Sequence, residues 1–214
     1  MIKTMKVPSI AKGLAVAMGF GAAAAVSAQV LLNPGSAGTM TANLVAGPAG
    51  TIAAWSSAGT ADDLGNFTAQ VDSAVTAGNT YGGNALTFWY RLTNVSPAPT
   101  AGAPLVSLGV PMPGSSPVVV DQVSAGGNLS NLGVNTGSAV AFFWSVNQIT
   151  LGQASSWQAI ETPFTAYYKG FVGAIDGTSE DVVALVPLIP EPSTYVGLFA
   201  LGLAGFAAYR RFRA

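Results

Sequence analysis

The chain has 214 residues, of which half are hydrophobic and 8% are charged, and it contains neither Cys nor His. That absence excludes disulfide bonds, thiolate and imidazole metal ligands, a Ser-His-Asp triad and a cysteine nucleophile. Between Gln29 and Ile189 two basic residues face eight acidic ones, a formal charge of −6. We expect no nucleic-acid binding, because two isolated cations cannot form the basic face that phosphates require.

Residues 1–28 have the three parts of a secretory signal peptide. Lys3, Lys6 and Lys12 come first, the apolar run GLAVAMGFGAAAA follows, and small residues occupy positions 26–28. We predict a signal-peptide helix that signal peptidase removes after Ala28. The alternative, a membrane anchor or a core helix, is disfavoured because about 13 apolar residues are short for a span and the small residues at 26–28 fit processing better.

Residues 29–189 are predicted to form one extracytoplasmic all-β domain, because apolar and polar residues alternate repeatedly and helical periodicity is almost absent. In the strand ALTFWYRLTNV, Leu86, Phe88, Tyr90 and Leu92 form an apolar row opposite Thr87, Trp89, Arg91 and Thr93. In AVAFFWSVNQI the corresponding row is Val140, Phe142, Trp144 and Val146. Further strands are predicted at 66–75, 117–123, 165–175 and 181–187.

Proline-rich segments separate these strands. SPAPTAGAP and GVPMPGSSP are expected to break strands, since proline cannot donate a ladder hydrogen bond. About eight to ten short strands joined by such loops predict a β-sandwich, jelly-roll-like or immunoglobulin-like.

Candidate chemistry in this domain is sparse. The loop from Asp176 to Asp181 offers oxygen ligands suited to Ca²⁺, but Asp-Gly is first of all a turn signal, so we expect no metal site. Adjacent carboxylates such as Asp62 and Asp63 point to opposite faces of a strand and cannot form a glycosidase pair, so we expect no cofactor and no enzyme activity. The aromatic residues that could stack on sugars are Trp55, Tyr81, Trp89, Trp157 and Tyr167.

Trp89 and Arg91 are the strongest ligand-binding candidates among these. Both lie on the predicted polar face of residues 85–95, together with two threonines. The competing interpretation is that Trp89 belongs to a core, as aromatic residues in strands usually do.

The C-terminal 190–214 segment combines three features. Pro190, Glu191 and Pro192 favour an extended chain, residues 193–209 form an uncharged apolar stretch about 25 Å long as a helix, and Arg210, Arg211 and Arg213 follow. The arginines are expected to stop transfer and to stay cytoplasmic. A permanent transmembrane anchor after a proline hinge is the alternative interpretation.

This order of features resembles the PEP-CTERM sorting signal of Gram-negative bacteria. The resemblance implies that exosortase, a membrane-embedded enzyme related to cysteine transpeptidases, recognises and processes the tail. The strands LTFWYRLTN, AFFWSVNQITLGQASS and YYKGFVGAIDG, ahead of VVALVP, are also similar to an exported domain of other PEP-CTERM proteins, which supports the sandwich more than any function.

Together these features predict an exported protein that passes through an inner-membrane-anchored intermediate to the cell surface or the medium. We expect a non-enzymatic cell-surface or extracellular-matrix protein associated with exopolysaccharide or biofilm. The alternative is a carbohydrate-binding module with a specific glycan site.

Overall fold

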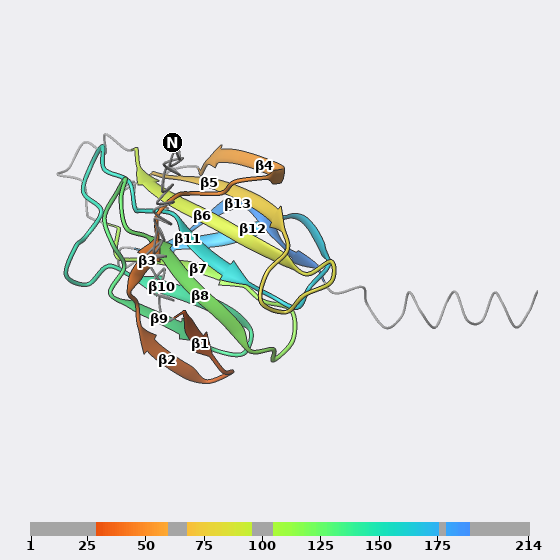
Figure 1. Cartoon of the computed structure of the whole chain (residues 1–214). Helices are drawn as coiled ribbons and strands as arrows, with labels where there is room; N and C mark the ends of the chain where they lie inside the picture. The colour runs from red at the N-terminus through yellow and green to blue at the C-terminus, as the bar shows by residue number, and fades with distance from the viewer. Residues whose placement is uncertain (1–28, 60–67, 96–104, 176–178, 189–214) are drawn as a thin grey trace, which may run out of the picture.

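The computed structural model describes residues 29–59, 68–95, 105–175 and 179–188, which form thirteen β-strands in two sheets (Figure 1). The described ranges contain no helix with the length and hydropathy that a membrane span requires. The predicted signal peptide with its cleavage site at Ala28, the proline motif, the apolar stretch and the arginines all lie outside the described residues.

The seven-stranded sheet has the order β1-β8-β11-β6-β5-β4, and β3 pairs in parallel with β8 beside β1. Its strands are β1 (Val30–Leu32), β3 (Ala42–Leu44), β4 (Thr51–Ala58), β5 (Ala69–Ala77), β6 (Leu86–Asn94), β8 (Val118–Val123) and β11 (Gln158–Glu161).

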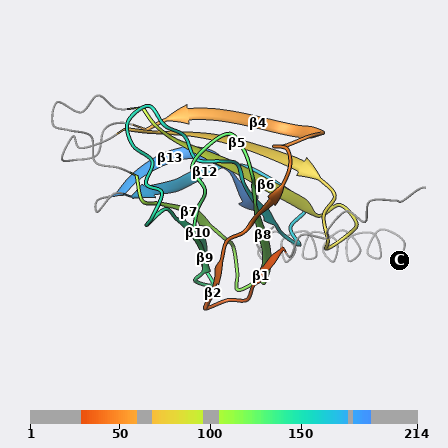
Figure 2. The same ribbon diagram turned by 60° about the vertical axis from the view of Figure 1, so that its left-hand side comes forward.

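The six-stranded sheet has the order β13-β12-β7-β10-β9-β2, and all its pairs are antiparallel. Its strands are β2 (Ser36–Thr39), β7 (Ser107–Pro111), β9 (Leu132–Asn135), β10 (Ala139–Phe143), β12 (Ala166–Ile175) and β13 (Ser179–Leu188). Figure 2 shows the two sheets as separate layers.

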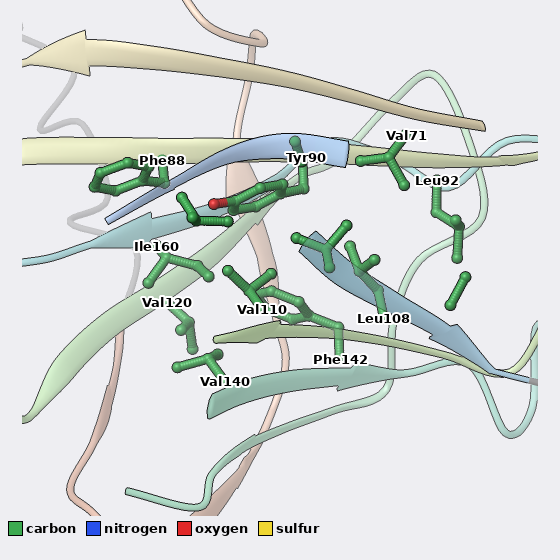
Figure 3. Packing of buried hydrophobic residues seen from close by; sticks show 14 of the residues in the cluster. Val71, Phe88, Tyr90, Leu92, Leu108, Val110, Val120, Val140, Phe142 and Ile160 are labelled. Atoms are coloured by element: carbon green, nitrogen blue, oxygen red, sulfur yellow. The ribbon is translucent and has the colours of Figure 1, made fainter. Parts of the chain in front are cut away.

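The core fills the space between the two sheets. The apolar row of β6 is buried as predicted, and Figure 3 shows Tyr90 and Leu92 pointing toward Leu108 and Val110 of the other sheet. The hydroxyl of Tyr90 donates to the carbonyl of Leu185 at 2.7 Å, and burial raises the pKa of Tyr90 well above its ordinary value. An all-β fold of two packed sheets is therefore confirmed.

The outer edge of β13 is closed by contacts with the seven-stranded sheet. Besides the bond from Tyr90, the backbone N–H of Leu185 donates to Ser73 Oγ at 3.0 Å, and Glu180 Oε2 accepts from the N–H of Ala69 at 2.7 Å. Unpaired strand edges promote aggregation, so these bonds protect an edge that would otherwise be open.

The prediction of eight to ten strands was too low. Seven short or small-residue strands were missed, namely β1, β2, β3, β4, β7, β9 and β11. Most of them lack the β-branched and aromatic runs by which strands are recognised. An immunoglobulin domain has about seven to nine strands and a jelly roll about eight, so the thirteen strands of this domain exceed both.

One local prediction was also wrong. β10 ends at Phe143, so Val146 does not continue its buried row and is 79% exposed, while the indole N–H of Trp144 donates to the carbonyl of Asn128. GVPMPGSSP breaks the chain between strands as expected, because β7 ends at Pro111 and β8 begins at Val118.

Candidate functional site

The outer face of the seven-stranded sheet carries most of the polar candidates. Strand register aligns Ala74, Trp89, Ala159 and Asp121 in one row across β5, β6, β11 and β8. The adjacent row is Thr76, Thr87, Glu161 and Val119. Trp89 and Arg91 therefore share a face, and antiparallel neighbours bring side chains from distant parts of the chain together.

Residues 45–50, here named the crossing segment, pass over this outer face from β3 at one edge to β4 at the other (Figures 1 and 2). Beneath it, Leu44 and Trp157 pack against a small apolar cluster that contains Trp89. A Cβ atom on Gly47 would lie 2.9 Å from the Trp157 ring, so a glycine is needed for this close approach.

Trp89 is consequently 9% exposed. Its indole N–H donates to Thr76 Oγ1 at 3.0 Å, which satisfies the ring's polar atom. Little of the ring is open for stacking, so any contribution to ligand binding comes from its accessible margin.

A hollow of about 420 Å³, here named the acidic hollow, lies on this face beside the crossing segment. Its lining combines an apolar wall with hydroxyl, amide and carboxyl groups and includes no basic residue. The lining residues are Gln29, Leu44, Val45, Ala46, Gly47, Ala49, Thr76, Ala77, Gly78, Thr87, Trp89, Asp121, Ala159 and Glu161.

Asp121 and Glu161 are the two carboxylates of the acidic hollow, and their situations differ. Glu161 Oε1 accepts from Gln29, and Oε2 accepts from the backbone and hydroxyl of Thr80. Asp121 is 2% exposed; its Oδ1 accepts from the N–H of Gln122 at 2.7 Å, and its Oδ2 is buried with no hydrogen-bond partner among the described residues.

The pKa of Asp121 is raised. Burial is the main cause and the charge of Glu161 adds to it, against hydrogen bonds from Gln122 and Asn43 that lower it. A buried carboxyl oxygen without a donor costs free energy, and Oδ2 of Asp121 is such an atom.

A second hollow of about 320 Å³ lies along the crossing segment toward β4, and its lining includes Asp72, Ser56 and Trp157. Arg91 donates to Asp72 Oδ2 from Nε at 3.0 Å and from Nη2 at 2.7 Å, and its guanidinium lies 5.2 Å from the centre of the Trp157 ring. Ser56 and Gln70 donate to Asp72 Oδ1. Arg91 is thus held by partners of its own chain.

Asp72 is expected to stabilise the fold at neutral pH. Burial alone would raise the pKa of Asp72, but hydrogen bonds from Ser56, Arg91 and Gln70 outweigh it, and the pKa is lowered. A lowered pKa means that this stabilisation is present above the unfolded-state value of about 3.9 and is lost as pH falls through the folded-state pKa.

Asp72→Asn should therefore reduce the free energy of unfolding by about 1 kcal/mol at neutral pH, a bond to a charged group reduced by solvent screening because its partner Arg91 is 39% exposed. Urea unfolding at neutral and acidic pH measures this. Equal stability of the variant and the parent at neutral pH would contradict the stabilising role.

The remaining aromatic candidates do not gather with Trp89. Trp55, 38% exposed on β4, stacks under Lys169 of β12, whose Nζ lies 3.1 Å from the ring centre. Tyr81 donates its hydroxyl to the carbonyl of Pro117, and Tyr167 lies exposed on β12.

The predicted turn at Asp176–Asp181 is described only from residue 179 onward. Glu180 is buried and bonded to Ala69, while its neighbour Asp181 is exposed on the other face of β13. The described residues hold no group of three or more acidic side chains that could bind a metal ion.

Sequence reasoning missed Asp121 and Glu161 as a pair. One signal was present, because Asp121 interrupts the apolar strand PVVVDQV and shares a face with Val119 and Val123. Nothing local, however, indicated that β8 and β11 would be neighbours.

Comparison with known families finds one match, the PEP-CTERM protein-sorting motif, at residues 188–211. No curated protein and no solved structure matches the chain. The matched residues begin at the last residue of β13.

Proposed function

We propose that this chain, which carries a PEP-CTERM sorting motif at residues 188–211, is exported and passed to exosortase through a membrane-anchored intermediate. In this proposal it is a non-enzymatic cell-surface or extracellular-matrix protein that binds exopolysaccharide. The acidic hollow is its proposed saccharide site. The observation that carries this proposal is the buried, unpartnered Oδ2 of Asp121 in that hollow.

The chemistry of the acidic hollow matches a neutral saccharide. Sugar hydroxyls are donors, and Asp121 has one buried oxygen without a partner at this hollow. Thr76 and Thr87 add hydroxyl groups to the lining, and Trp89 and Leu44 form an apolar wall. Small-ligand sites are commonly mostly apolar with a few convergent polar groups. Acidic sugars fit poorly, because the lining has two carboxylates and no cation.

Binding without cleavage is the proposed outcome. Glycoside hydrolysis uses two carboxyl groups about 5 to 10 Å apart, one of them free to protonate the leaving oxygen. Glu161 is engaged through both oxygens by Gln29 and Thr80, and Asp121 is almost fully buried. We therefore propose that the acidic hollow binds a glycan without cleaving it, and incubation of the protein with bound glycans should release no new reducing ends.

Asp121→Asn should weaken glycan binding by about 10-fold or more, the loss of a hydrogen bond to a charged acceptor. The exchange keeps the side-chain shape and the Oδ1 acceptor for Gln122. Binding of the purified exported protein to a glycan array, followed by titration of the best glycan, measures the effect.

Asp72→Asn is the matched control, since it makes the same exchange on the same outer face of the sheet. Both oxygens of Asp72 already accept hydrogen bonds from side chains of the protein. It should leave glycan affinity unchanged. Equal affinity of the Asp121 variant and the parent would exclude the acidic hollow as the site, and no binding to any glycan would favour a matrix role without a discrete site.

A further inference from the structure

We propose that in the membrane-anchored intermediate the domain stands on the bilayer with one end of the sandwich, the end where β12 begins and β13 finishes, in contact with the lipid interface. The partner is the lipid surface itself. This inference rests on the sorting motif and is independent of saccharide binding.

The end in question, here named the Leu188 end, is defined by strand direction. Pairing puts the finish of β13 beside the start of β12, and the finish of β5 beside the starts of β6 and β4. The Leu188 end comprises the described residues 29–36, 48–52, 77–87, 111–119, 135–139, 161–168 and 187–188.

Chain length forces this end toward the membrane. The apolar stretch predicted to span the bilayer starts at Ser193, five residues after Leu188. Five residues reach at most about 18 Å when fully extended. Ten-residue strands such as β12 and β13 are about 33 Å long. When these strands stand upright on the bilayer, the opposite end of the sandwich is therefore farther from the lipid than the Leu188 end.

The surface of the Leu188 end suits a lipid interface. It exposes six large hydrophobic side chains, three of them tyrosines, on elements of both sheets: Leu31, Ile52, Tyr81, Tyr167, Tyr168 and Leu188. Tyrosine is enriched at membrane interfaces because its ring is apolar and its hydroxyl is polar.

The charge of the Leu188 end is equally compatible with lipid. Among its described residues Glu161 is the one acidic or basic side chain, and both of its oxygens are occupied by protein donors. Lys169 follows at the next position of β12, stacked on Trp55. The acidic residues Glu180 and Asp181 lie at the start of β13, at the opposite end.

The test uses three exposed positions on one face of β12, namely Tyr167, Phe171 and Ile175, which are about 13 Å apart along the strand. The chain has no cysteine, so each position can carry a single engineered thiol with a fluorescent label: Tyr167→Cys, Phe171→Cys or Ile175→Cys. Each full-length variant, prepared without exosortase, is placed in phosphatidylethanolamine–phosphatidylglycerol vesicles that contain a lipid-attached quencher.

We expect quenching by the lipid-attached quencher to fall in the order 167, 171, 175, with at least about a twofold difference between the first and the last position. Quenching by aqueous iodide should rise in the same order.

Tyr168→Ser combined with Tyr81→Ser should reduce this gradient, and circular dichroism checks that the fold is kept. Equal quenching at all three positions would mean that the outer face of β12 lies flat on the bilayer. Quenching at none of them would mean that the domain is detached from the bilayer. Either result overturns the proposal, as does a gradient that appears only when exosortase is added, which would assign the surface to the enzyme.

Discussion

Replacing Pro190, Glu191 and Pro192 together by alanine is expected to leave the protein in the membrane at its unprocessed mass. The three residues lie within the matched sorting motif, immediately before the apolar stretch. Alanine removes the preference for an extended chain that the prolines give, while the apolar stretch and the arginines expected to retain the chain remain. Intact-mass measurement in a host that carries exosortase reads the result.

A neighbouring pair of substitutions, Ser193→Ala with Thr194→Ala, is the control for this variant. It changes the same part of the tail and keeps the proline motif, so processing should resemble that of the parent. If the triple-alanine variant is trimmed like the parent, the three residues are a linker and the motif is recognised elsewhere.

Trp89→Ala is expected to reduce the free energy of unfolding by about 3 to 5 kcal/mol, because it removes a large buried side chain and leaves a cavity. The loss has two parts: packing within the outer apolar cluster to which Trp89 belongs, and the hydrogen bond to Thr76. Small domains are stable by only about 5 to 15 kcal/mol, so a large share of the total is at stake. Urea unfolding followed by circular dichroism measures it.

Trp55→Ala makes the same exchange at a tryptophan that is 38% exposed, and it should cost about 1 kcal/mol or less, chiefly the contact with Lys169. Trp89→Phe should fall between the two, since the ring is retained and the N–H is lost. A Trp89→Ala protein that is as stable as the parent but no longer binds glycan would show that Trp89 acts as a stacking platform.

Local sequence was sufficient for those features that depend on neighbouring residues. The alternation in LTFWYRLTN placed Leu86, Phe88, Tyr90 and Leu92 in the core and put Trp89 and Arg91 on one opposite face, because side chains in a strand alternate whatever the strand pairs with. The sorting motif was equally accessible, since its parts are contiguous along the chain.

Small-residue strands were beyond this reasoning. β2 (SAGT) and β11 (QAIE) have weak intrinsic strand preference, and pairing with β9, β6 and β8 stabilises them. Strand formation there is a consequence of the sheet, and the sheet is assembled from residues far apart in the sequence.

The candidate site shows the same division. The sequence by itself determined that Trp89 and Arg91 share a face, that the chain lacks imidazole and thiol groups, and that a sorting signal follows the domain. Only the tertiary structure decided that β8 and β11 are neighbours, which brings Asp121 and Glu161 to one hollow, and that the crossing segment covers Trp89. The physical reason is that periodicity fixes which way a side chain points, whereas strand order and the path of a loop follow from how the whole chain buries its apolar surface.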